Sequence, residues 1–140
     1  MNEEVEQIKK MAESGLVGVF KKTYFVQAEN NFIKNPKYTV NQKMVYLALQ
    51  TYAGAVTSCF PSKSTLAKDL NLSEKTVYTV LKQLEELGAI LIINQITETN
   101  RKSSNMYMLA DIDKNTGEFI PDTIKQFKCL TLEPIRIKGK

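Results

Sequence analysis

The stretch Pro61–Gly88, PSKSTLAKDLNLSEKTVYTVLKQLEELG, has the pattern of two helices joined by a tight turn. We expect the first helix at about Ser62–Leu70, because a serine hydroxyl can cap the free N–H groups at a helix start. Ser73 can cap the second helix in the same way, and Gly88 follows its last turn, where glycine commonly ends a helix. Asn71 stands between the two helices, and asparagine tolerates the left-handed backbone that a sharp turn requires.

The second of these helices is expected to have one buried face and one polar face. Its apolar residues recur every three or four positions, which places them in a single stripe. The stripe comprises Val77, Val80, Leu81, Leu84 and Leu87. The opposite face comprises Lys75, Thr76, Tyr78, Thr79, Lys82 and Gln83. We therefore expect the apolar stripe in the core and the polar, cationic face outside it.

A further helix is predicted before this stretch. Thr39-Val40-Asn41-Gln42 has the form of a capping box, in which the Gln42 side chain reaches back to the Thr39 N–H. The helix reaches about Tyr52 and ends near Gly54. Its inner face is expected to comprise Val40, Met44, Leu47 and Ala48, broadened by Val45, Leu49 and Tyr52. We expect Val77, Leu81 and Leu84 to face Met44, Leu47 and Leu66.

Strands are predicted on both sides of the two central helices. A short strand is expected at Ser58–Phe60, and the β-rich run Ala89–Gln95 is followed by a returning strand at Asn105–Ala110. The polar loop between the last two strands contains the adjacent cations Arg101 and Lys102.

This order of elements resembles a winged helix-turn-helix over about residues 39–110. Ala67 is small where the two helices cross closely, and Asn71 stands four residues later, where the family usually has glycine. The pattern FPS, TLA, LS.KTV...L..LE.LG.I and SN.Y.L also resembles domains of phage and plasmid replication proteins of Gram-positive bacteria, a group that includes DnaD-type N-terminal domains. The resemblance implies a mainly α fold with a small β-sheet (α+β). An ordinary helical hairpin would share the amphipathic pattern, but not this register of small, turn and apolar positions.

Two extensions flank the predicted winged helix. Residues 1–38 combine a helix over residues 2–14 with an extended or irregular segment; Val5, Ile8, Met11 and Ala12 share one face of that helix. This face either packs on its own domain or forms a dimer contact. Residues 111–140 begin with a hairpin turning at Asn115-Thr116-Gly117. The following IKQFKCLTL fits helix and strand equally, and the end IRIKGK is expected to be mobile.

Composition narrows the function classes. The 140 residues carry 19 Lys and Arg against 15 Asp and Glu, giving a net charge of +4 that permits a nucleic-acid partner. No apolar run approaches the ~20 residues of a membrane span. The charged start MNEEVEQIKK lacks the pattern of a signal peptide, so we expect a cytoplasmic protein.

Catalysis has little support in the residue types. The chain has no histidine, its six glycines are scattered, and Cys59 and Cys129 are too far apart for a zinc pattern. A buried free thiol is expected at Cys59. We expect no enzyme activity, cofactor, metal ion or small-molecule ligand.

Duplex DNA is the expected partner, because a major groove about 12 Å wide admits one helix. The candidate DNA-binding residues are Ser73, Lys75, Thr76, Tyr78, Thr79, Lys82, Arg101 and Lys102. Ser73 lies at a helix N-terminus, which can meet phosphate, and Lys75 can donate to guanine edges. Tyr78 suits a base or sugar contact, or packing on the wing. Arg101 and Lys102 are placed to meet the minor groove or its phosphates.

The biological role is expected to be phage or plasmid replication or maintenance, with transcriptional regulation as the alternative. A winged helix used for protein–protein interaction would need an apolar face in place of the polar one. We also expect a homodimer, because one such domain reads only a short half-site. The apolar residues of Val5–Ala12 and Phe119–Leu132 have no assigned partner and suit an interface between copies.

Overall fold

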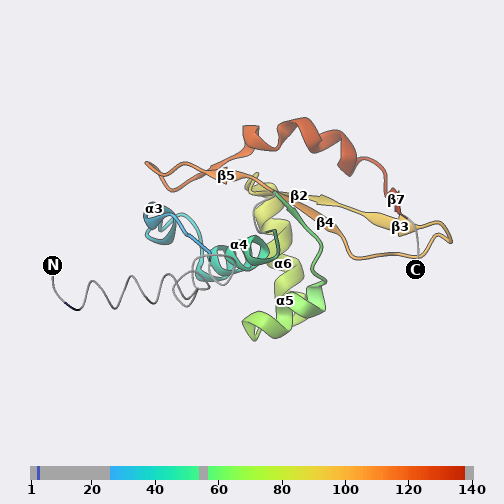
Figure 1. Ribbon diagram of the computed structural model, residues 1–140, viewed down its shortest axis with the longest axis horizontal. Helices are drawn as coiled ribbons and strands as arrows, with labels where there is room; N and C mark the ends of the chain where they lie inside the picture. Colours follow the sequence, from blue (N-terminus) through green and yellow to red (C-terminus); the bar gives the residue numbers. More distant parts are fainter. Residues whose placement is uncertain (1–2, 4–25, 54–56, 138–140) are drawn as a thin grey trace.

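The computed structural model describes residue 3 and residues 26–53 and 57–137 (Figure 1). The helices are α3 (Asn30–Ile33), α4 (Val40–Ala53), α5 (Lys63–Leu70) and α6 (Glu74–Glu86), with 3-10 helices η1 (Pro121–Thr123) and η2 (Lys125–Thr131). The strands are β1 (Ser58–Cys59), β2 (Ile90–Ile93), β3 (Gln95–Thr97), β4 (Met106–Leu109), β5 (Asp111–Ile112), β6 (Phe119–Ile120) and β7 (Ile135–Ile137). These residues form an α+β fold, as expected. Over the ranges described, no helix has the length and apolar character needed to cross a membrane.

Helices α5 and α6 form at the predicted positions because their ends are capped locally. The hydroxyl oxygens of Ser62 and Ser73 each accept a hydrogen bond from the backbone N–H three residues on, at 3.0 and 3.1 Å. Asn71 has φ 55° and ψ 45°, the predicted left-handed conformation. Gly88 follows α6 with φ +76°, which favours glycine. The predicted turn between two capped helices is confirmed.

Helix α4 also begins as predicted, but its buried face is different. The Thr39 N–H donates to Gln42 Oε1 (3.0 Å), and the Gln42 N–H donates to Thr39 Oγ1 (3.1 Å), which completes the capping box. The predicted inner face was wrong at Val40, Met44 and Tyr52, which are 75%, 44% and 45% exposed. The buried residues of α4 are Val45, Tyr46, Ala48, Leu49 and Ala53. Tyr46 explains why a different face of α4 is buried, because its large ring fills the core and its hydroxyl donates to the Ala110 carbonyl.

The apolar stripe of α6 lies in the core. Val77, Val80, Leu81 and Leu84 are all buried, and Leu87 is half-buried against the same cluster. This part of the predicted packing is confirmed, and Leu49 of α4 and Leu66 of α5 belong to the same cluster. Met44, which we expected to face the α6 stripe, lies outside that cluster.

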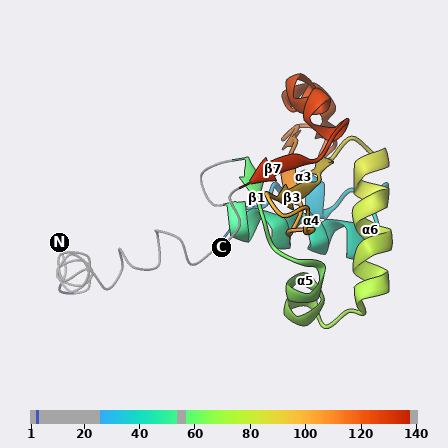
Figure 2. The same cartoon turned by 90° about the vertical axis from the view of Figure 1, so that its right-hand side faces the viewer.

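The sheet is antiparallel, with the strand order β1-β4-β2, and it separates two layers. Ile90, Ile92, Tyr107 and Leu109 belong to the core shared with the helices. The alternate residues Leu91, Ile93, Met106 and Met108 pack with Ile124, Phe127, Leu130 and Ile135. Figure 2 shows α5 and η2 on opposite sides of the strands. The segment IKQFKCLTL, which the sequence assigned to neither helix nor strand, therefore contains a 3-10 helix that covers the second face of the sheet.

Both flanks of the predicted winged helix contribute to the main core. Phe32 and Tyr38 precede it and Phe119 follows it, and their rings form one cluster with Tyr46 at centroid distances of 4.7–5.8 Å. The Phe119 N–H also donates to the Tyr38 hydroxyl at 3.2 Å. The expectation that Phe119–Leu132 lacks a partner within the chain was therefore wrong at its two buried residues, Phe119 and Ile124.

The β5–β6 hairpin turns where it was predicted and lies directly against α3. Gly117 has φ +73°, and a Cβ there would lie 2.2 Å from the Asn31 carbonyl oxygen. The Asn31 side chain donates to the carbonyl of Lys114 at 2.7 Å, and that of Asn35 donates to the carbonyl of Gly117 at 3.1 Å. The segment around these asparagines was expected to be extended or irregular, but part of it is helix α3. The two asparagine side chains bind this segment to the hairpin.

The C-terminal end is a strand as far as residue 137, so the expectation of a mobile IRIKGK was wrong for its first residues. Strand β7 pairs in parallel with β3, in the register Gln95↔Ile135, Ile96↔Arg136 and Thr97↔Ile137. The predicted helix over residues 2–14 and most of its extended sequel fall outside the described residues.

Candidate nucleic-acid interface

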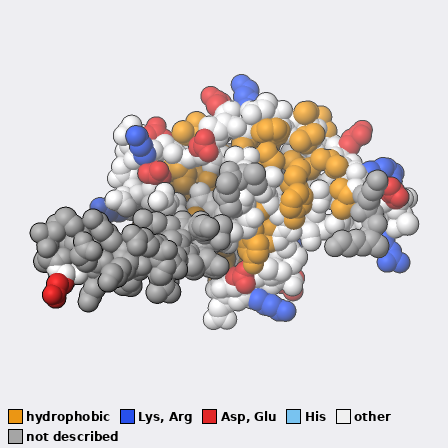
Figure 3. All heavy atoms as spheres, in the orientation of Figure 1, with side chains coloured by type: hydrophobic (Ala, Val, Ile, Leu, Met, Phe, Trp, Pro, Cys, Tyr) orange, Lys and Arg blue, Asp and Glu red, His pale blue; other side chains and the backbone are white. Residues whose placement is uncertain are grey.

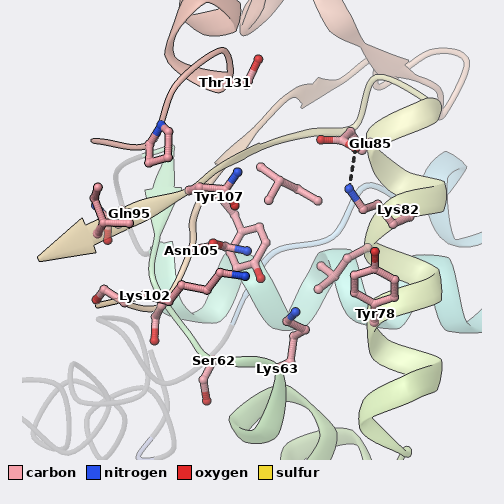
Figure 4. Close-up of a pocket in the computed structure, with 17 residues that line it drawn as sticks. Ser62, Lys63, Tyr78, Lys82, Glu85, Gln95, Lys102, Asn105, Tyr107 and Thr131 are labelled. Atoms are coloured by element: carbon pink, nitrogen blue, oxygen red, sulfur yellow. Dashed lines mark ion pairs between the residues drawn. The ribbon is translucent and has the colours of Figure 1, made fainter. Parts of the chain in front are cut away.

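A groove of about 630 Å³ lies between α6 and the hairpin that runs out along β2 and β3 and returns along β4 (Figure 4). Helix α6 contributes Tyr78 and Lys82 to one wall, and the hairpin contributes Lys102 and Asn105 to the other. Lys63, the first residue of α5, extends into the groove from below. The groove therefore brings cations from three separate elements to one place.

The candidate residues of α6 share an accessible face. Lys75, Tyr78, Thr79 and Lys82 are exposed, and Thr76 is half-buried. The sequence placed Gln83 on this face as well, but its Oε1 accepts a hydrogen bond from Gln42 Nε2 of α4 at 3.0 Å. The open face is therefore narrower than predicted.

Hydroxyl groups near the start of α6 are held by their own helix. Ser73 Oγ donates to Thr76 Oγ1 at 2.8 Å while it accepts the capping N–H. Thr79 Oγ1 donates to the Lys75 carbonyl at 3.0 Å. Each threonine hydroxyl keeps accepting capacity, and its methyl group remains available for an apolar contact such as a thymine methyl.

Tyr78 forms the centre of the α6 wall. Lys63 Nζ lies 4.9 Å from the centroid of its ring, and Lys82 Nζ lies 5.9 Å from it. Cations at this distance are attracted by the negative face of an aromatic ring. Lys82 also lies 3.5 Å from a carboxylate oxygen of Glu85 (dashed in Figure 4). Tyr78 thus lies beside two lysines along the groove, and its side chain is exposed.

The hairpin loop is ordered by its own hydrogen bonds. The Thr97 N–H donates to the Arg101 carbonyl at 2.8 Å, and the Asn100 N–H donates back to the Thr97 carbonyl at 2.9 Å. Asn100 has φ +63°, the left-handed conformation that asparagine tolerates. The structure places Arg101 and Lys102 beside this turn, both exposed, and only Lys102 lines the groove.

The sequence analysis missed Lys63 as a groove residue. Its only local signal is a cation directly after the Ser62 cap, and that position does not indicate which way the side chain turns.

Lys and Arg side chains also lie at the end of the molecule formed by β3 and β7 (Figure 3). A second hollow of about 530 Å³ beside η1 and η2 is lined by Glu85, Glu86 and Asp122 as well as lysines, which suits a polyanion less well.

The two cysteines have different environments. Cys59 is a buried free thiol, as expected, and burial raises its pKa from 9.0 to about 12. Cys129 is a free and exposed thiol. Within the described ranges, no three His, Cys, Asp or Glu side chains cluster in a way that could hold a metal ion.

Comparison with known proteins adds one finding. Residues 39–90 match the family model of a helix-turn-helix domain. The match runs from the capping box of α4 to the first residue of β2, so it contains α4, β1, α5 and α6. The comparisons with curated proteins and with solved structures gave no match. The family match supports a helix-turn-helix domain, and with it DNA binding, in this part of the chain.

Proposed function

We propose that this protein binds duplex DNA sequence-specifically as a winged helix. Helix α6 would enter the major groove, and the hairpin from β2 and β3 to β4 would act as the wing on the flanking backbone or in the minor groove. One observation carries this proposal: the cationic face of α6 and the cationic side of the hairpin open on the same groove. A duplex presents phosphates on both sides of the major groove, so a helix flanked by a basic hairpin matches its charge pattern.

The topology is consistent with a winged helix. The order helix, short strand, helix, turn, helix, strand, basic loop, strand runs from α4 to β4. The sheet β1-β4-β2 covers the core and carries the hairpin next to α6. The wing thus extends from the same rigid layer that holds α6, which favours a fixed spacing between the two.

The position of each residue would determine whether it contacts bases or phosphates. Lys75, Thr76 and Thr79 lie in the first two turns of α6, the part of such a helix that reaches base edges. Ser73 lies at the N-terminus of α6, where the backbone N–H groups favour phosphate. Arg101 and Lys102 on the wing would hold phosphates, and so would Lys63 and Lys82 along the groove. Tyr78 would keep these two lysines in place and meet the sugar or base between them.

The proposed role is phage or plasmid replication or maintenance, which rests on the resemblance of the sequence pattern. Transcriptional regulation by the same binding mode is the alternative. The polar face of α6 favours DNA over a protein partner, and we propose no enzymatic activity. We also propose a homodimer on DNA, and sedimentation that gives a monomer with and without DNA would exclude it.

Competition binding against single-base variants of a selected site tests the proposal. Lys75→Ala or Thr79→Ala should change base preference by ~1–3 kcal/mol at one position. The pair Arg101→Ala and Lys102→Ala should weaken all sequences equally and reduce the salt slope by about one unit per lost phosphate contact. Lys114→Ala, in the β5–β6 turn at the other end of the molecule, is the matched control. Wild-type binding that does not depend on salt would contradict the proposal.

A further inference from the structure

The hairpin has a third strand, which comes from the C-terminal end of the chain. Strand β7 covers the outer edge of β3, and the Ile135 N–H donates to the Asn94 carbonyl at 2.8 Å just before the pairing begins. Ile135 packs into the cluster between the sheet and η2, so the strand is anchored by apolar burial as well. The edge of β3 is therefore occupied along its whole length.

The register places Arg136 on the same face of the β3–β7 sheet as Ile96. Residues paired across strands point to the same face of a sheet. Ile96 pairs with Arg136 on one side and forms a bridge with Lys102 on the other. Ile96 and Lys102 line the groove and Arg136 lies beyond its edge, so the row Lys102–Ile96–Arg136 runs outward from the groove across one face of the hairpin. The two cations flank one isoleucine.

A side-chain hydrogen bond fixes Arg136 to the loop of the hairpin. Its Nη1 donates to Asn100 Oδ1 at 2.9 Å. Arg136 is exposed, and a guanidinium has five N–H donors, so the remaining donors can bind a phosphate at the same time. In the part of the chain that the structure describes, no carboxylate forms an ion pair with Arg136.

We infer that Arg136 is a phosphate-binding residue of the DNA interface, placed on the wing by strand β7 and by Asn100. This inference rests on the proposed function and extends it to a segment outside the helix-turn-helix match. The wing then carries three cations, and the C-terminal strand is a part of the binding element.

The salt dependence of DNA affinity gives the expected size of the effect. One phosphate contact contributes about 0.9 to the slope of log K against log salt. If this ionic contribution vanishes near 1 M salt, Arg136→Gln should weaken binding about eightfold at 0.1 M and about fourfold at 0.2 M. The loss should be equal for selected and unrelated duplexes, because a phosphate contact carries no sequence information.

Three further variants of the full chain distinguish a direct contact between Arg136 and phosphate from an indirect, structural role of Arg136. Arg136→Lys keeps the charge and should keep the salt slope. Asn100→Gly tolerates the positive φ and removes only the acceptor, so it should weaken binding less than Arg136→Gln does, because strand β7 still holds Arg136 on the wing. Lys125→Gln, an exposed cation on η2, is the control and should bind as wild type. An unchanged slope for Arg136→Gln overturns the inference, and so does an equal loss for Lys125→Gln.

A second measurement uses the wild-type chain and needs no variant to fold. Arg101 and Arg136 are the two arginines of the sequence. Phenylglyoxal modification, read by mass spectrometry, should be slowed at both positions by bound duplex. Modification of Arg136 at the same rate with and without DNA overturns the inference while DNA binding itself still stands. A wild-type chain that binds no duplex overturns the proposed function, and the inference falls with it.

Discussion

Asn71 shows how one side chain sets the angle between two helices. Its left-handed backbone ends α5, and the Leu72 N–H then returns to the Ala67 carbonyl at 3.0 Å. Asn71→Ala should lower the free energy of unfolding by about 1 kcal/mol, because a Cβ without a polar partner disfavours this conformation. Asn71→Gly should stay within about 0.5 kcal/mol of wild type. Urea denaturation of the wild type and the two variants measures both values. An alanine variant as stable as the wild type would contradict the left-handed conformation of Asn71.

The two thiols should differ in reactivity. Burial raises the pKa of Cys59 to about 12, so its thiol is protonated at pH 8 and has almost no nucleophilic thiolate. Cys129 is exposed. At pH 8, an aromatic disulfide reagent should label one thiol rapidly, and the second only after unfolding. Cys129→Ser should abolish the rapid phase, and Cys59→Ser should leave it unchanged.

The raised pKa of Cys59 also determines the direction in which the stability of the fold changes with pH. Its folded-state pKa lies above the ordinary 9.0, so the unfolded chain loses the proton first as pH rises. The contribution of this group is fully present below pH 9 and is lost as pH rises toward 12. The buried Tyr46 and Tyr107, whose pKa values burial also raises, act in the same direction. Chemical denaturation should therefore show a free energy of unfolding that falls through this range.

Helix α6 and helix α4 offer a matched pair of truncations. Leu81 is 2% exposed in the core, so Leu81→Ala should cost ~2–5 kcal/mol. Met44 of α4 is exposed, and Met44→Ala should change stability by less than ~0.5 kcal/mol. Thermal and urea unfolding measure both. A large loss at both positions would mean that α4 packs on α6 in the register expected from sequence and not in the one described.

Local signals made α5 and α6 predictable, and their absence explains the errors. Caps, a turn asparagine and one narrow apolar stripe lie within a few residues of each other, so they fix an element without reference to the rest of the chain. Helix α4 has apolar residues around much of its circumference, and only the fit of Tyr46 to distant partners selects its buried side. The same holds for β7, because three residues form a strand there only when β3 is beside them.

The residues of the candidate site likewise fall into those that local sequence signals predict and those that depend on distant contacts. The exposed cations of α6 and of the hairpin follow from helix periodicity and from a polar loop between two strands. Lys63 and Arg136 do not, because each is placed by a contact with a residue far away in sequence: the Tyr78 ring lies beside Lys63 in the groove, and Asn100 binds Arg136 at the hairpin loop. A linear pattern contains no sign of such a contact.

The aromatic cluster makes the helix-turn-helix segment dependent on its flanks. Tyr46 has Phe32 and Phe119 as ring neighbours, and neither lies within residues 39–110. Loss of one buried phenylalanine ring costs about 3–5 kcal/mol, against a typical total stability of 5–15 kcal/mol. A fragment of residues 39–110 should therefore show no cooperative thermal unfolding, whereas residues 26–137 should unfold in one transition. Equal stability of the two fragments would contradict this expectation.

The contact between Tyr38 and Phe119 joins positions 81 residues apart. A ribosome adds about 5–20 residues per second, so about 4–16 s separate the synthesis of the two rings. Once Tyr46 has been added, Phe32, Tyr38 and Tyr46 are all present while the Phe119 ring that completes their cluster is still missing. The nascent chain thus carries exposed aromatic surface until Phe119 has been synthesised, and the helix-turn-helix segment should reach its final packing only after that point.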